Sequence, residues 1–137
     1  MYVEEISPKL HIRTIILLHG MNQDISEMIK IKNYINKYKK GNKFIIPIAD
    51  NIDIHWPDGK EKNISSWYNY FTRYDNKVKH DLIDTLQLKK ITNKLINIIK
   101  SESKIIDPSK ITLIGISQGG TVCINAALML QFKIKSV

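Results

Sequence analysis

The sequence is poor in cysteine and in arginine. It has one cysteine, Cys123, and only two arginines, Arg13 and Arg73, among its 21 basic residues. A single cysteine cannot form an internal disulfide, and its place in an apolar helical run predicts a buried, unreactive thiol. Arginine is the residue that nucleic-acid sites favour for binding phosphate, and the lysines here are spread along the chain. The formal net charge of +8 therefore does not by itself predict a nucleic-acid partner.

Long hydrophobic runs are also absent from the sequence. No apolar run approaches the roughly 20 residues that span a membrane, and the first five residues lack the pattern of a signal peptide. We therefore expect an intracellular, cytoplasmic protein without an integral membrane segment. The chain has 137 residues, of which 43% are apolar and 25% charged, as is ordinary for a soluble globular domain. No repeat, linker or low-complexity tract divides it, so a single domain over residues 1–137 is predicted.

Apolar segments of two kinds alternate along the chain. Short segments rich in β-branched residues predict buried strands at residues 12–18, 44–48 and 110–115. Longer periodic segments predict helices between the caps Asp24 and Gly41, at 85–102 and at 119–130. Residues 1–10 read as a polar lead-in, and residues 132–137 as the opening of another strand. The alternation indicates a three-layer αβα domain whose sheet is mostly parallel, with helices on both faces.

Residues 49–80 have no such periodicity and are expected to be irregular. Turn chemistry recurs there, at Asp50-Asn51, Pro57-Asp58-Gly59 and Asn63. An aromatic cluster, Ser65–Phe71, lies within this region. Two interpretations of the cluster stay open: a local hydrophobic plug, or the wall of a binding cleft in which Trp67 and Tyr68 contact a substrate.

A Gly-x-Ser-x-Gly motif occupies residues 115–119, between the last predicted strand and the last predicted helix. Strand, sharp turn and helix with this motif at the turn are typical of a nucleophile elbow. The serine, Ser117, needs a strained turn to project its hydroxyl, and the flanking glycines have no Cβ to clash there. The alternative is a glycine-rich turn that packs tightly or cradles a phosphate. The sequence has neither a P-loop nor a dinucleotide fingerprint, and we interpret Ser117 as a nucleophile.

A serine nucleophile needs a general base and two backbone N–H groups that hold the oxyanion. In α/β-hydrolases one donor is the residue after the nucleophile, here Gln118, and the other lies in a loop after an early strand. Residues 17–21 are a candidate for that loop. His19 within it has two interpretations, as the base or as a residue that holds the loop by hydrogen bonds. We favour the second, because the base of this fold comes late in the chain.

Five runs of the sequence resemble, in order, landmarks of the phospholipase/carboxylesterase family of α/β-hydrolases, which includes acyl-protein thioesterases. They are Leu18–Met21, Phe44–Ala49, Ser66–Tyr68, Asp107–Ile111 and Gly115–Gly120. The resemblance implies that Ser117 is the nucleophile and that the backbone N–H groups of Met21 and Gln118 form the oxyanion hole. It implies hydrolysis of a small-molecule ester, a lipid or an acylated protein through an acyl-enzyme. No metal or organic cofactor is implied, because no His/Cys/Asp cluster has ligand spacing.

The sequence departs from the family pattern most strongly after Ser117. In this fold the acid and the base follow the nucleophile, but the 20 residues after Ser117 include no Asp, Glu or His. The other histidines precede the elbow: His11, His55 and His80. Two smaller departures are Asn22, where the family often has glycine, and Asn69, where it usually has aspartate.

These departures lead us to expect the N-terminal part of a hydrolase, with the C-terminal strands and helices missing. Loss of triad members leaves only residual catalysis, so the chain alone is expected to turn over esters poorly or not at all. Two other functions stay open. One is a non-catalytic hydrolase remnant that acts as an interaction module through an uncovered sheet edge. The other is a basic nucleic-acid-binding domain, which salt-dependent retention of DNA or RNA would support.

Overall fold

The computed structural model describes the backbone of residues 1–56, 59–75 and 78–137 and the side chains of residues 1–55, 61–70 and 82–137. Its strands are β1 (Tyr2–Ile6), β2 (Arg13–Leu18), β3 (Asn42–Ile48), β4 (Asn51–Trp56), β5 (Gly59–Ser65), β6 (Tyr70–Asp75), β7 (Val78–Ile83) and β8 (Ile111–Gly115). Its helices are α1 (Ile25–Tyr38), α2 (Thr85–Glu102) and α3 (Gln118–Met129), with a 3₁₀ turn, η1, at Pro108–Lys110.

The central sheet has the strand order β1-β3-β2-β8. Strands β3, β2 and β8 are parallel, and β1 pairs with β3 in the antiparallel direction. Every residue of β3 is buried, as the continuous apolar run predicts for an interior strand. The expectation of a polar lead-in over residues 1–10 is wrong, because residues 2–6 form β1. The backbone of β3 needs a hydrogen-bonding partner on that side, and side-chain polarity does not prevent an edge strand from supplying one.

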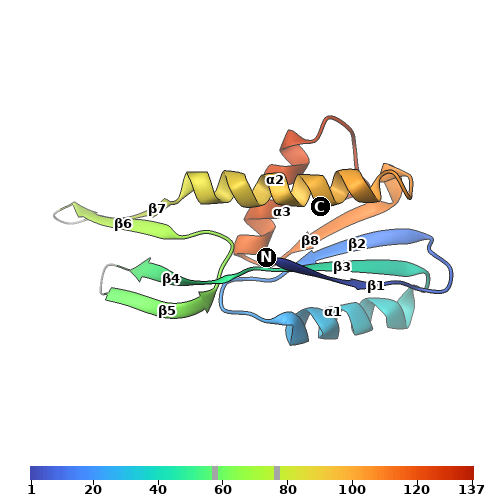
Figure 1. Ribbon diagram of the computed structural model, residues 1–137, viewed down its shortest axis with the longest axis horizontal. Coiled ribbons are helices and arrows are strands. Elements are labelled where there is room, and N and C mark those ends of the chain that lie inside the picture. The colour runs from blue at the N-terminus through green and yellow to red at the C-terminus, as the bar shows by residue number, and fades with distance from the viewer. Residues whose placement is uncertain (57–58, 76–77) are drawn as a thin grey trace.

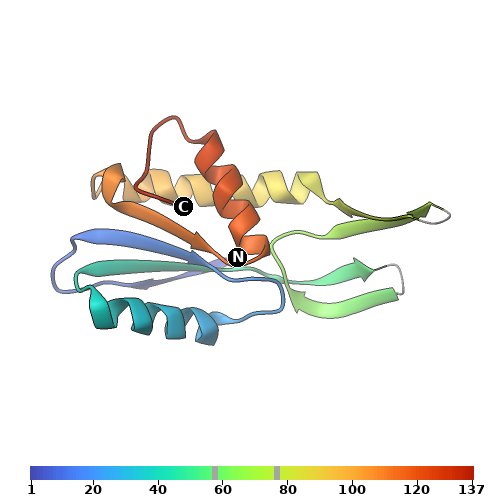
Figure 2. The same ribbon diagram turned by 180° about the vertical axis from the view of Figure 1, so that it is seen from behind.

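Helices cover both faces of this sheet, which confirms the predicted three-layer architecture. Helix α1 lies on one face, and α2 and α3 lie together on the other (Figures 1 and 2). The core accordingly has two parts. The α1 side is built around Met28 and Phe44, and the α2/α3 side around Leu95, Ile99 and Leu113, all of them nearly inaccessible to solvent. The helices at 85–102 and 118–129 agree with the predicted ranges within about one residue.

The region between residues 51 and 83 consists of two β-hairpins, so the expectation of irregular structure there is wrong. Strand β4 pairs with β5, and β6 with β7, both in the antiparallel direction. The signal was the alternation of Ile52 and Ile54 with polar residues, which is the period of a strand. The turn residues recur because hairpins need turns. Both hairpins extend from the same end of the central sheet (Figure 1).

Some expectations for this region fall outside the described residues. They are the turn at Pro57-Asp58 and the side chains of Phe71 and His80.

Helix α1 begins at the predicted cap, where the Asp24 carboxylate accepts a hydrogen bond from the Ser26 amide at 2.8 Å. It ends earlier than predicted, with Lys39 as its C-cap. Gly41 lies two residues further on with a φ of +79°, a conformation that favours glycine, and turns the chain into β3. At the other end of the chain, Ser136 forms a single parallel bridge with Thr112 beside β8, where the opening of a strand was predicted.

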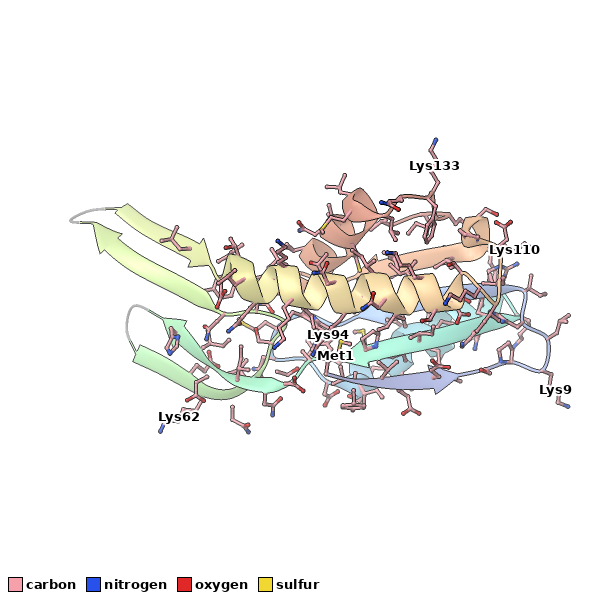
Figure 3. All side chains as sticks on the ribbon, turned by 45° about the horizontal axis from the view of Figure 1, so that its top comes forward. Met1, Lys9, Lys62, Lys94, Lys110 and Lys133 are labelled. Atoms are coloured by element: carbon pink, nitrogen blue, oxygen red, sulfur yellow. The ribbon has the colours of Figure 1, made fainter. Side chains whose placement is uncertain are left out.

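Lysines lie on well-separated parts of the surface (Figure 3). Lys9, Lys62, Lys110 and Lys133 belong to different segments and point away from one another. This distribution agrees with the spread of lysines along the sequence. Within the described part of the chain, none of the helices combines the length and the apolar character needed to cross a membrane.

Candidate functional site

The Gly-x-Ser-x-Gly motif forms a sharp turn between β8 and α3. Ser117 has φ 49° and ψ −118°, a conformation that is rare for residues with a side chain. Its side chain is exposed, whereas Gln118 and Gly119, which follow it, are buried. The serine therefore projects from the surface at the N-terminus of a helix, and its role as a nucleophile stays a prediction. We call this turn, residues 115–120, the elbow.

Two glycines of the motif have no room for a side chain. A Cβ on Gly115 would lie 2.4 Å from the backbone of Gly119. A Cβ on Gly119 would lie 2.5 Å from the carbonyl oxygen of His19 and 2.6 Å from that of Leu18. Gly120 is less constrained, because its Cβ would lie 3.3 Å from the nearest atom, the Gly115 oxygen. The elbow is thus packed directly against the backbone at the end of β2.

The loop of residues 19–22 lies beside the elbow because β2 and β8 are neighbours in register. Leu18 pairs with Gly115, and the Ile116 amide donates to the Leu18 carbonyl at 3.0 Å. Among the described residues, no acceptor pairs with the amide of Met21 or with that of Gln118 at the start of α3. The amide of Asn22, a residue with φ 59°, donates to the Ser65 carbonyl at 2.8 Å. The structure therefore places the two predicted oxyanion donors on adjacent segments with free N–H groups.

His19 is fully buried, and both of its ring nitrogens bond to the backbone. Nδ1 lies 2.6 Å from the Gly20 carbonyl, which can only accept, so Nδ1 carries the proton. Nε2 accepts from the Ala49 amide at 3.0 Å. Burial lowers the pKa of His19, an effect opposed by the bond to Gly20 and by nearby carboxylates. These bonds confirm that His19 holds the loop in place, and a neutral imidazole with both nitrogens engaged has no free position for a proton transfer.

Trp67 and Tyr68 are buried, at 5% and 2% exposure, in the core on the α2/α3 side of the sheet. The Trp67 ring packs on the His19 ring with centroids 4.7 Å apart, and its indole nitrogen donates to the His19 carbonyl at 2.7 Å. Burial raises the pKa of Tyr68. These contacts fit the interpretation of the aromatic cluster as a hydrophobic plug. Contact of the two side chains with a substrate stays a prediction.

The side chains of Gln118, Ser66 and Asn69 also organise this region, and we did not predict these roles from the sequence. The side-chain amide group of Gln118 forms hydrogen bonds with Ser66, Trp67 and Tyr68. Asn69 accepts from the amides of His55 and Tyr70 and donates to the Asp53 carbonyl. Such contacts join residues up to 52 positions apart, and one sequence gives no signal for them.

Besides His19, the histidines with described side chains are His11 and His55. The Nε2 atom of His11 is 3.5 Å from the Glu102 carboxylate, at the opposite end of the parallel strands. His55 lies in β4, and its backbone amide donates a hydrogen bond to the side-chain oxygen of Asn69. Over the residues with described side chains, none hydrogen-bonds to the Ser117 hydroxyl, and none of the His, Cys, Asp and Glu side chains form a group of three or more suited to a metal ion.

A mostly parallel sheet with helices on both faces and a sharp Gly-x-Ser-x-Gly turn between a strand and a helix is the arrangement of the α/β-hydrolase fold. The chain belongs to the phospholipase/carboxylesterase family, whose sequence model matches residues 3–137. None of the curated protein sequences matches it.

Solved structures of α/β-hydrolases resemble the chain closely in fold. Acyl-protein thioesterase 2 of Zea mays superposes with a TM-score of 0.64 over 92% of this chain, at 19% identity. SOBER1 of Arabidopsis thaliana gives 0.71 over 89% at 17% identity, and the carboxylesterase of Bacillus cereus gives 0.64 over 98% at 14% identity. The chain spans 50%, 57% and 55% of these three proteins, respectively.

Proposed function

We propose that the protein is a serine hydrolase that cleaves carboxylic esters or thioesters, with Ser117 as its nucleophile. The observation that carries this proposal is the exposed serine at φ 49°, since strained backbone of this kind is kept at functional sites. In the first step the Ser117 oxygen attacks the acyl carbon and its proton passes to a general base. The alcohol or thiol then leaves with that proton, and water cleaves the acyl-enzyme to release the acid.

The amides of Met21 and Gln118 are the proposed oxyanion donors. Both N–H groups are free of acceptors in the described structure, and the loop and the elbow that carry them are in direct contact. Developing negative charge is also favoured by the N-terminus of α3, where Gln118 is the first residue. Each oxyanion donor contributes about 10²- to 10³-fold to the rate in serine hydrolases.

The proposed substrate is a small ester, a lipid or an acylated protein, and the proposed location is the cytoplasm. Membership of the phospholipase/carboxylesterase family supports ester or thioester chemistry. Within the described structure no imidazole contacts Ser117, and His19 is engaged in its loop. We therefore propose that residues 1–137 by themselves hydrolyse esters slowly, and that covalent labelling is the more sensitive test.

The test is reaction with a fluorophosphonate, followed by mass spectrometry of the labelled peptide. We expect an adduct on Ser117 that disappears in the variant Ser117→Ala. The matched control is Ser101→Ala, which removes an exposed serine of α2 and is expected to leave labelling unchanged. A folded wild-type chain without any adduct on Ser117 would contradict the proposal.

A second candidate is a non-catalytic interaction module that binds through the edge of the sheet at β8. Among the described residues, β8 pairs on that side only with the short segment around Ser136. Helix α3 beside it exposes Ile124, Leu128 and Met129. An unlabelled chain that self-associates or captures another polypeptide, as measured by sedimentation, would favour this function over hydrolysis.

A further inference from the structure

A short segment between the two hairpins contacts both parts of the proposed oxyanion hole. We call residues Ser65–Tyr68, which connect β5 to β6, the bridging segment. Toward the loop of residues 19–22 it makes two short bonds, besides a longer one of 3.5 Å between the Ser65 hydroxyl and Nε2 of His19. The Ser65 carbonyl accepts from the Asn22 amide at 2.8 Å, and the Trp67 indole donates to the His19 carbonyl at 2.7 Å.

Toward the elbow, the bridging segment bonds to the side chain of Gln118. The Oε1 atom accepts from the Trp67 amide at 3.1 Å and lies 2.9 Å from the Ser66 hydroxyl, whose single proton is shared between Oε1 and the Tyr68 carbonyl at 2.8 Å. The Nε2 atom donates to the Tyr68 carbonyl at 3.1 Å. Gln118 thus contributes its backbone amide to the proposed oxyanion hole and its side chain to the bridging segment.

This bridging network is buried and built from neutral groups. Ser66 is 4% exposed, Trp67 5% and Gln118 2%. The side chain at position 118 faces the Trp67 amide, which needs an acceptor, and the Tyr68 carbonyl, which needs a donor. A glutamine amide supplies both, whereas an ionised carboxylate or an aliphatic side chain does not. A buried polar group that loses its partner destabilises the fold. These bonds therefore specify one arrangement of the bridging segment against the elbow.

We propose that the bridging segment fixes the spacing between the Met21 and Gln118 amides, with Trp67 and the Gln118 side chain as positioning residues. This inference rests on the proposed function, because it takes these two amides as the oxyanion donors. Pairing of β2 with β8 fixes the position of the two strands relative to each other, and the bond from the Ile116 amide to the Leu18 carbonyl is the last between them. The Met21 and Gln118 amides lie beyond this bond. Oxyanion stabilisation depends on donors placed within tenths of an ångström, so a second anchor is needed there.

The first experiment tests the spacing without requiring any catalysis. Amide hydrogen exchange is measured for Asn22 and Gly119, which lie in the loop and the elbow, in the variants Trp67→Phe and Gln118→Met. We expect exchange at both amides to rise about tenfold or more, because each variant removes bonds of the bridging segment. The control is Thr14→Val, which removes a buried bond to Glu102 at the other end of the strands. Unchanged exchange at Asn22 and Gly119, or an equal rise in the control, overturns the proposal.

The second experiment tests the consequence for Ser117. Trp67→Phe keeps an aromatic ring on His19 but removes the indole donor, and it is expected to slow fluorophosphonate labelling about tenfold. For ester turnover the loss is expected in kcat with KM nearly unchanged, because the oxyanion forms after binding. If Trp67→Phe is labelled as fast as the wild type, the inference is overturned. If the wild type itself is not labelled, the proposed function is overturned, and the hydrogen-exchange experiment alone tests whether the bridging segment fixes the spacing of the two amides.

The conservative variant Gln118→Glu supplies a pH-dependent readout, which is measured only over the pH range in which the variant stays folded. Its ionised carboxylate accepts the bonds from Ser66 and Trp67 but cannot donate to the Tyr68 carbonyl. A protonated carboxyl restores that donor. We therefore expect its labelling rate, divided by that of the wild type at each pH, to rise as the pH falls from 8 to 5. A constant ratio overturns the role assigned to the side chain.

Discussion

The two ends of the parallel strands are both held by buried polar networks, but their chemistry differs. At the carboxyl ends, where Ser117 lies, the network is neutral and consists of His19, Ser66, Trp67 and Gln118. At the amino ends it is charged and centres on Glu102, a carboxylate with 3% exposure at the end of α2. The comparison indicates that the network at the carboxyl ends positions the backbone around Ser117. The network at the amino ends attaches α2 to the sheet.

The charged network joins three strands to α2. Glu102 accepts from the Thr14 hydroxyl at 2.6 Å and from the Lys43 ammonium at 2.8 Å, and Lys43 also pairs with Glu5 at 3.2 Å. Burial alone would lower the pKa of Lys43, but its hydrogen bonds to Glu102 and Glu5 outweigh this and raise the pKa. A buried carboxylate of this kind is stabilised only while its partners remain.

Removing the central carboxylate is expected to give the largest loss of stability. The variant Glu102→Ala leaves Lys43 with one exposed partner, Glu5, and Thr14 with only His11, and we expect the free energy of unfolding in urea to fall by about 3–5 kcal/mol. The control Glu5→Ala removes a half-exposed partner of Lys43 and is expected to cost at most about 1 kcal/mol. Labelling of Ser117 in the folded variant should stay at the wild-type rate. A slower rate would show that the two ends are coupled and would contradict the comparison.

A matched pair of glycine variants disturbs the site end. Gly119→Ala places a Cβ within 2.6 Å of two carbonyl oxygens at the end of β2, and neither backbone can move without shifting the loop. We expect a loss of about 2–3 kcal/mol and no labelling of Ser117. Gly120→Ala meets its nearest atom, the Gly115 oxygen, at 3.3 Å and lies in the first turn of α3, where alanine is favoured over glycine, so it should change the free energy of unfolding by less than about 1 kcal/mol. Equal effects of the two variants, in urea unfolding and in labelling, would show that the close approach at Gly119 is unimportant.

Sequence periodicity predicted the elements that bury one face or lie inside the sheet. Helix α2 was predicted over its full range, because Leu95 and Ile99 recur at helical spacing. The same spacing places Glu102 on the buried stripe, a signal for the charged network that we did not use. The sequence analysis did not predict the hairpins, because the many turn residues indicated irregular structure and hid the alternation of apolar and polar residues in β4. The position of Ser117 followed from the motif, but the network around Gln118 depends on residues about 50 positions away, and local patterns do not contain that information.

The smallest predicted effect concerns pH and depends on His19. Burial lowers its pKa below the ordinary 6.5, so the unfolded chain binds the proton more readily than the folded chain. Well above pH 6.5 His19 is neutral in both the folded and the unfolded chain, and its contribution to the free energy of unfolding is constant. As the pH falls below 6.5, the free energy of unfolding is expected to fall by at most about 1.4 kcal/mol per pH unit, until the folded-state pKa is reached.

The comparison of the wild type with His19→Gln isolates this contribution, because glutamine has a donor and an acceptor but does not titrate. Asp24, Asp50 and Asp107 have pKa values lowered from 3.8, so their stabilisation is lost only at more acidic pH, and it cancels in the difference between the two proteins. We expect the two urea-unfolding curves to diverge below pH 6.5, and Ala49 amide exchange to rise in the wild type, since a protonated Nε2 cannot accept its bond. Parallel curves between pH 7 and pH 5 would mean that the charge state of His19 does not distinguish the folded from the unfolded chain. The neutral network would then not depend on the imidazole, and the contrast with the charged end would rest on Gln118 and Trp67 alone.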